Sequence, residues 1–250
     1  NATDHHGDTP LIIAAENNNT QILQFLVDNN ADVHQKAGDG RNALHQAAKY
    51  NQDTNICDIL LKSGVDINAQ DQSGDTALLL AAENTCPEIL KFLIYSNADV
   101  NISAFDGLTA LHFATLYQKD TTILKMLIEA GLSVDVQDQN GITPLMWTAM
   151  NDDHEMLKFL INNEADVTKT TVSGNTALHY AAKYSKDATN CKRLLDSGSD
   201  VYAENDRGEI PLKWAEENPG VARYLSAVGK PQSKCCKIFS PIWKKMSVSY

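Results

Sequence analysis

Three histidines recur at a fixed distance along the chain, because His45, His112 and His179 are each 67 residues apart. Imidazole can ligate a metal ion or transfer a proton. Each histidine stands in its own copy of a repeated stretch, such as "TALHYAAKY", and another copy lies between each pair. If every copy advances by the roughly 10 Å that separates packed helices, neighbouring histidines lie about 20 Å apart. Metal ligands must lie within about 2–2.5 Å of the ion, so we expect structural hydrogen-bonding histidines and no metal site.

Other reactive residues are also without a recognisable catalytic arrangement. The stretch "DHHGD" near the start is too short and too close to a chain end to predict a metal site. No nucleophile elbow, P-loop or H-E-x-x-H motif occurs in the sequence. We therefore expect a protein without catalytic residues or a cofactor, and not an enzyme.

The five cysteines do not form a disulfide framework or a paired zinc motif. Cys57 and Cys191 stand at apolar helical positions, where a free thiol behaves as a small hydrophobic group. This usage favours a reducing compartment, the cytoplasm or the nucleus.

The last 21 residues, 230–250, differ from the rest of the chain, and we treat them as a separate tail. They contain five lysines and no acid, and Cys235 and Cys236 stand among lysines and bulky apolar residues. One interpretation is S-palmitoylation of these two cysteines, with membrane contact through the basic tail. The other is that the tail packs against the acidic body; disorder or a short docking motif is also left open.

Residues 1–229 are acidic, with 16 basic side chains against all 32 acids, which gives a net charge of −16. Such a charge argues against binding a nucleic-acid backbone and favours a partner with a basic surface. No apolar run reaches the roughly 18 residues that a membrane span requires.

The elements that position these residues follow from an internal repeat. Glycines mark it at alternating spacings of 33 and 34 residues: Gly7, Gly40, Gly74, Gly107, Gly141, Gly174 and Gly208. After each glycine comes a run such as "TALHYAA", in which Thr176 can cap a helix and small alanines allow close packing. A second apolar run follows, for example "EILKFLI". A single helix pair cannot bury its apolar face, so the copies are expected to stack.

The stretch "GDTPLIIAAENNNTQILQFLVDNNADV" resembles an ankyrin repeat, and six successive matches cover residues 1–229. The resemblance implies an all-α solenoid of stacked helix pairs with β-hairpin-like loops. From Gly208 the sequence departs from the pattern and is interpreted as a C-terminal capping unit. The resemblance also implies a concave groove, lined by hairpin tips and inner helices, that binds a protein. Asn68 and Asn101 stand where this family is often hydroxylated, although an asparagine there can also merely satisfy the hairpin entry.

Two columns of residues carry the 67-residue period toward the expected groove. At the end of the inner run, tyrosine alternates with asparagine: Asn17, Tyr50, Asn84, Tyr117, Asn151, Tyr184 and Asn218. Duplication of a two-repeat block and a ladder for an extended partner both explain this alternation. A second column becomes aromatic in the C-terminal half: Phe113, Trp147, Tyr180 and Trp214. We expect the partner-binding residues to be Tyr50, Phe113, Leu116, Tyr117, Trp147, Met150, Tyr180 and Tyr184.

The sequence therefore favours a non-catalytic scaffold or adaptor that binds a protein with a basic or extended segment. A membrane-associated regulatory domain anchored by the tail is one alternative. An inhibitor that masks a basic surface of a transcription factor is another, and it rests on the family resemblance alone.

Overall fold

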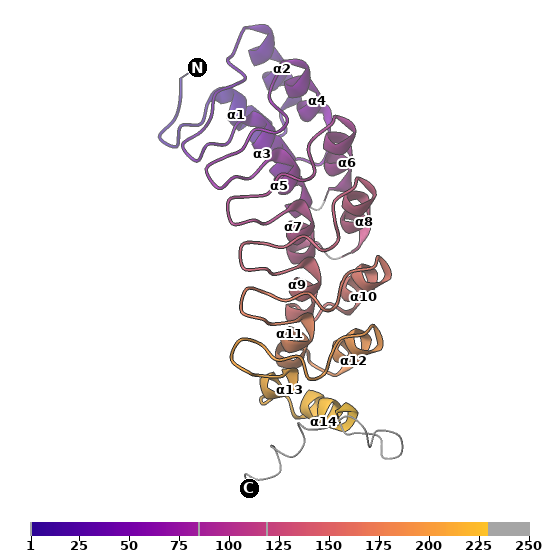
Figure 1. Ribbon diagram of the computed structural model, residues 1–250. Helices are drawn as coiled ribbons and strands as arrows, with labels where there is room; N and C mark the ends of the chain where they lie inside the picture. The colour runs from indigo at the N-terminus through magenta and orange to yellow at the C-terminus, as the bar shows by residue number, and fades with distance from the viewer. Residues whose placement is uncertain (1, 85, 119, 230–250) are drawn as a thin grey trace.

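The computed structural model describes residues 2–84, 86–118 and 120–229. Its helices form two parallel rows that curve gently along the stack (Figure 1). The inner row comprises α1 (Pro10–Glu16), α3 (Ala43–Tyr50), α5 (Ala77–Glu83), α7 (Ala110–Tyr117), α9 (Pro144–Met150), α11 (Ala177–Tyr184) and α13 (Pro211–Trp214). The outer row comprises α2 (Thr20–Asp28), α4 (Asn55–Lys62), α6 (Pro87–Tyr95), α8 (Thr122–Glu129), α10 (His154–Asn162), α12 (Thr189–Asp196) and α14 (Pro219–Val228). This arrangement confirms the all-α solenoid of helix pairs.

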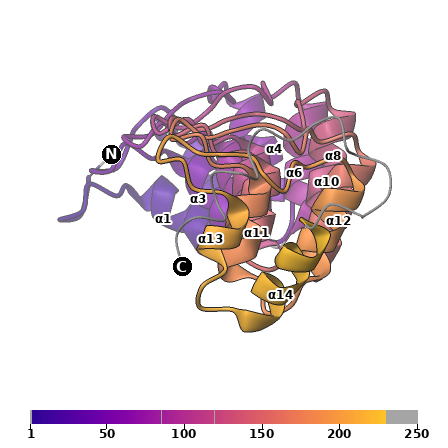
Figure 2. The ribbon, with the colours of Figure 1, turned by 60° about the horizontal axis from the view of Figure 1, so that its bottom comes forward.

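The inner helices pack in a continuous row because their facing residues are small. Ala47, Ala48, Ala81 and Ala82 are completely buried where α3 meets α5. Without longer side chains in between, the two backbones can approach closely. The inner helices therefore form one layer, and the outer helices form a second layer against it (Figure 2).

Most inner helices begin at a threonine, as the sequence predicts, whereas the N-cap is Asn42 in α3 and Ile210 in α13. Thr9, Thr76 and Thr143 are N-caps whose side-chain oxygens accept the N–H three residues later, at 3.2–3.3 Å. Thr176 is the N-cap of α11, as predicted. Pro10 and other prolines at the first helical position fit there because that position needs no intrahelical N–H bond.

Loops join each outer helix to the next inner helix and stack into a continuous edge (Figure 1). Asp71 Oδ1 accepts the backbone N–H groups of Ser73 and Asp75 at 2.8 and 2.9 Å, which closes the turn. Each turn also donates to the preceding one; for example, Gln139 N–H donates to Asp106 O at 3.0 Å. The only β-bridge among the described residues joins Thr170 and Thr176, so these loops resemble hairpins but do not form a sheet.

The repeating glycine is required by both its conformation and its neighbour. Gly107 has φ of +84°, and a Cβ atom there would lie 2.8 Å from the backbone nitrogen of Gln139 in the next loop. Only glycine allows the loops to stack this closely at such a dihedral angle.

Two features are absent from the described residues: a membrane-spanning helix and a cluster of metal-binding side chains. In residues 2–229, apart from 85 and 119, no helix is both long and apolar enough to cross a membrane. Within the same part of the chain, no group of three or more His, Cys, Asp or Glu side chains could hold a metal ion.

Candidate protein-binding surface

The three periodic histidines connect neighbouring repeats. In the fourth repeat, His112 Nδ1 accepts the N–H of Thr109 at 3.1 Å, and Nε2 donates to the carbonyl of Ile142 at 3.0 Å. His45 and His179 make the same pair of bonds. All three are buried, and burial lowers the pKa of each imidazole because it disfavours the charged form. The interpretation as structural hydrogen-bonding residues is confirmed.

The predicted tyrosine column consists of Tyr50, Tyr117 and Tyr184, the last residues of α3, α7 and α11. Their exposed fractions are 51%, 50% and 46%, so about half of each side chain is accessible to solvent. Lys49 Nζ lies 5.8 Å from the Tyr50 ring centroid, and Lys183 Nζ lies 5.0 Å from that of Tyr184. The structure therefore provides three similar aromatic positions, two repeats apart.

Between Tyr117 and Tyr184 lie partly exposed aromatic and apolar side chains. Met150 of α9 and Tyr180 of α11 pack against the core with part of their surface free, and Trp147 of α9 is also partly exposed. We call the set Tyr117, Trp147, Met150, Tyr180 and Tyr184 the inner-helix surface.

Phe113 and Trp214, the other residues of the predicted aromatic column, mainly pack against neighbouring rings. Phe113 is only 9% exposed and lies 6.2 Å, centroid to centroid, from the ring of Tyr117, which it supports. Trp214 packs edge-on to Tyr180 at 5.6 Å. Leu116 is partly exposed beside Tyr117. Fewer aromatic side chains of this column are therefore exposed than the sequence predicted.

The loop edge carries most of the negative charge. The seven loops before the inner helices (2–9, 29–42, 63–76, 96–109, 130–143, 163–176 and 197–210) contain 17 of the 32 acids but only four of the 21 basic residues. The three central loops contain no basic residue and seven acids: Asp66, Asp71, Asp75, Asp99, Asp106, Asp135 and Asp138. Asp71 is buried and forms an ion pair with Arg41 of the preceding loop at 3.0 Å, and Asp75 is buried as well. Asp66, Asp99, Asp106 and Asp138 accept backbone N–H groups, which fixes these carboxylates in place without neutralising them. The edge therefore favours cationic groups on a partner.

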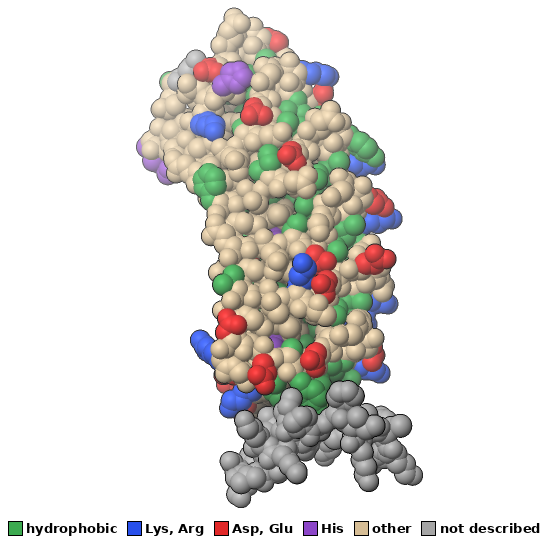
Figure 3. All heavy atoms as spheres, in the orientation of Figure 1, with side chains coloured by type: hydrophobic (Ala, Val, Ile, Leu, Met, Phe, Trp, Pro, Cys, Tyr) green, Lys and Arg blue, Asp and Glu red, His purple; other side chains and the backbone are tan. Residues whose placement is uncertain are grey.

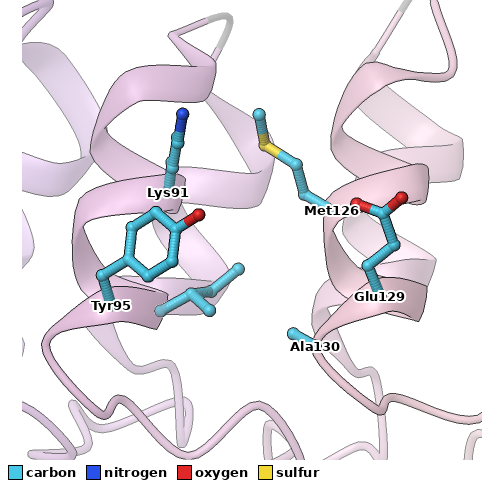
Figure 4. Close-up of a pocket in the computed structure, with 6 residues that line it drawn as sticks. Lys91, Tyr95, Met126, Glu129 and Ala130 are labelled. Carbon is cyan, nitrogen blue, oxygen red and sulfur yellow. The ribbon is translucent and has the colours of Figure 1, made fainter.

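The outer helices are more evenly charged. Figure 3 shows basic side chains close to acidic ones along this side of the molecule. A shallow cavity of about 280 Å³ lies between α6 and α8. Figure 4 shows Lys91 and Tyr95 on one side of it and Met126 and Glu129 on the other. Tyr95 is 77% exposed. The outer face thus provides an exposed tyrosine outside the inner-helix surface.

Sequence reasoning missed two exposed apolar residues at the loop tips, Phe105 and Val172. Both follow the residue that opens the turn, and they are 67 residues apart. The same period that identified the tyrosines could therefore have identified them.

The predicted modification sites have different surroundings. Asn68 Oδ1 accepts the N–H of Asp99 in the next loop at 2.9 Å, whereas Asn101 bonds only locally, to Asp99. Cys235 and Cys236 lie outside the described residues. Cys57 and Cys191 are free and buried, and burial raises the pKa of each thiol to about 12.

Comparison with known proteins agrees with this architecture. The family model described as "Ankyrin repeats (3 copies)" matches residues 1–71, 44–138 and 111–205. The B-cell lymphoma 3 protein homolog of Mus musculus is 31% identical over 220 residues, which cover 84% of this chain and 48% of that protein. Inversin of Homo sapiens is 29% identical over 209 residues, or 81% of this chain and 20% of that protein. The chain thus spans about half or less of the length of these relatives.

Two solved structures have the same fold. The ankyrin repeat domain of Bcl-3, described as a unique member of the IkappaB protein family, has a TM-score of 0.72 and 27% identity, and the match covers 89% of this chain and 100% of that one. The human ASB11 ankyrin repeat domain has a TM-score of 0.78 and 20% identity, over 90% and 99% of the two chains.

Proposed function

The chain belongs to the ankyrin-repeat family, and on that premise we propose that it is a scaffold or adaptor that binds a partner protein on its inner-helix surface. The observation that carries this proposal is the half exposure of Tyr117 and Tyr184, which end α7 and α11 in one continuous row of inner helices, with α9 between them. The Tyr117 ring already lies against the ring of Phe113, so it loses little conformational entropy on binding, and tyrosine combines apolar area with a hydroxyl group.

The chemistry of the surface favours one type of partner. Trp147, Met150 and Tyr180 offer apolar contact between the tyrosines, and the acidic loop edge lies along the same stack of repeats. A segment with apolar and basic side chains matches both features. A nucleic-acid backbone would be repelled by residues 1–229, whose net charge is −16.

Site-specific photo-crosslinking tests the proposal with the full chain. A photoreactive phenylalanine analogue replaces Tyr117, Tyr184 or Tyr95, one at a time, and crosslinked proteins are identified by mass spectrometry. We expect the Tyr117 and Tyr184 positions to capture the same protein. The Tyr95 position, which is more exposed but lies on the outer face, is the matched control.

Capture of that protein only from Tyr95, or of unrelated proteins from Tyr117 and Tyr184, would refute the proposal. Tyrosines are preferable to Trp147 for this test because the Trp147 Nε1 atom is buried. A change at Trp147 would therefore alter the stability of the fold as well as the surface.

A second candidate function is the masking of a basic surface of a transcription factor. It is favoured by the acidic loop edge together with the likeness to Bcl-3 and to the nuclear factor NF-kappa-B p105 subunit of Gallus gallus, which is 28% identical over 213 residues. The same crosslinking experiment identifies such a partner. The buried free thiols of Cys57, Cys86 and Cys191 support a reducing compartment, the cytoplasm or the nucleus.

A further inference from the structure

The two types of repeat use equivalent residues for different purposes. At the end of the inner helix, 33-residue repeats have asparagine where 34-residue repeats have tyrosine. Asn84 Nδ2 donates to the carbonyls of Ala48 and Asn51 in the preceding repeat, at 3.0 and 2.8 Å. Asn218 donates to the carbonyl of Ser185 in the same way. These asparagines hold neighbouring repeats together.

The loop tips show the same division independently. Gln72 and Gln139 follow the turn-opening residue in 33-residue repeats, and each donates its amide to a backbone carbonyl of the preceding loop, Gly38 and Phe105 respectively. In 34-residue repeats the equivalent positions are Gly38, Phe105 and Val172, and the apolar side chains of the last two are exposed. The repeat of Gly74 therefore uses both positions for joining, whereas the repeats of Gly107 and Gly174 leave both for display.

The spacing of the displayed residues has a geometric consequence. If each repeat advances by about 10 Å, Tyr117 and Tyr184 lie about 20 Å apart along the stack. An extended strand rises by about 3.3 Å per residue, so it spans this distance in about six residues. Because strand side chains alternate between two faces, an offset of six returns to the same face. A distance of one repeat corresponds to about three residues of the strand. Anchors that contact adjacent repeats would therefore lie on opposite faces of the strand.

The charge of the loops adds a second requirement. The loops that precede α7, α9 and α11 (96–109, 130–143 and 163–176) contain six acids and one basic residue, Lys169. These loops precede the inner helices and the tyrosines end them, so the acids act on the strand over the length of an inner helix, about 12 Å. At that distance the strand gains from lysine or arginine between its anchors and loses from acids.

We propose that the partner segment is an extended, basic strand whose apolar anchors are six residues apart and are received by Tyr117 and Tyr184. This inference rests on the proposed function and specifies the register and the charge of the ligand. Tyr50 offers a third position at the same interval, so a longer segment would place another anchor six residues further along.

Synthetic peptides test the register with the full 250-residue chain. The probes are fluorescent 15-residue peptides of serine and lysine that contain two leucines, either six or five residues apart, with identical composition. A third probe has leucines six apart and glutamate in place of lysine. Binding is measured by fluorescence anisotropy at low salt, where charge complementarity is least screened.

We expect the six-residue peptide to bind about fivefold more tightly than the five-residue peptide, the effect of one well-placed aromatic contact. Tyr184→Ala should abolish that preference, whereas the matched variant Tyr95→Ala should retain it. The glutamate peptide should bind more weakly than either.

Equal affinity of the two lysine peptides, or no binding of either up to about 1 mM, would overturn the proposal. So would equal binding of the glutamate peptide. If the Tyr117 and Tyr184 rings of the full chain are already shielded from quenchers without peptide, residues 230–250 fill the surface and the external strand is wrong. Crosslinking of one protein at Tyr117 and Tyr184 without a register preference would refute the register alone, whereas failed crosslinking would refute the proposed function.

Discussion

Replacing His112 with leucine tests whether the histidines join the repeats. His112 is completely buried and bonds to two backbone groups that belong to different repeats. Leucine is accepted at the equivalent position of a 33-residue repeat, where Leu79 is fully buried. The substitution therefore preserves apolar packing and removes mainly the two hydrogen bonds.

The expected magnitude follows from the groups left behind. The N–H of Thr109 and the carbonyl of Ile142 would each lose a partner, and a buried unpaired group costs about 1–3 kcal/mol. Because leucine recovers part of this through apolar burial, we expect His112→Leu to lower the free energy of unfolding by about 2–4 kcal/mol. Urea unfolding of the full chain at pH 7.5 measures it. His34→Leu is the control, because His34 is exposed.

The pH dependence of this loss identifies its cause. Nδ1 of His112 accepts an N–H, so it cannot also carry a proton, and burial lowers the pKa of the ring. Because the folded-state pKa is lowered, the neutral histidine contributes its full stabilisation above the unfolded-state pKa of about 6.5. This stabilisation is lost as the pH falls through the folded-state pKa. The difference between wild type and His112→Leu should therefore shrink from pH 7.5 to pH 5. A difference below about 0.5 kcal/mol at pH 7.5 would show that the histidines do not join the repeats.

Two further substitutions test the loop edge. Burial, with Asp71 adding repulsion, raises the pKa of Asp75 from 3.8 to about 6, so the ionised carboxylate costs stability above that pH. Asp75→Asn should increase the free energy of unfolding by about 1–3 kcal/mol at pH 7.5 and by little below pH 4; an equal gain at both pH values would contradict the ionic cause. Gly107→Ala should destabilise the chain by at least about 1–2 kcal/mol more than Gly64→Ala, because both glycines have positive φ but only Gly107 meets the next loop; equal thermal unfolding shifts would contradict the crowding.

Much of the fold could be predicted because the signals are local and repeated. Thr176 caps its helix and His179 bonds to its neighbours as the motif implies, since these roles depend on residues at fixed offsets within one repeat and the next. The exposure of Tyr117 also follows from its position at a helix end. The burial of Phe113 was not predictable in this way, because it depends on how closely α7 packs against the helices on either side.

The candidate site was predicted less completely for a related reason. Sequence comparison showed that Asn84 alternates with tyrosine, but not that its amide reaches two carbonyls of the preceding repeat. That bond depends on the relative position of two repeats, which no single repeat encodes. For the same reason the opposite uses of Gln72 and Phe105 at the loop tips become evident only in the assembled stack.

The 67-residue period finally reflects two kinds of junction as well as two kinds of surface. Where a 34-residue repeat precedes a 33-residue repeat, a histidine such as His45 bonds to the next loop. Where the order is reversed, a glutamine such as Gln70 donates to the next loop, at the carbonyl of Ser103. Gln137 does the same 67 residues later.

Because the two junctions use different residues, neither type of repeat can stack on its own kind with the same bonds. Duplication of a two-repeat block would produce the alternation, and these junctions give a physical reason for its persistence in the fold. The exposed tyrosines therefore repeat with the same 67-residue period as the junctions. In the repeats of Asn84 and Asn218 the asparagine at the helix end donates to the preceding repeat. In the repeat of Tyr117 the next residue, Gln118, makes that bond, which leaves the tyrosine half exposed, so spacing by two repeats follows from the way the stack is joined.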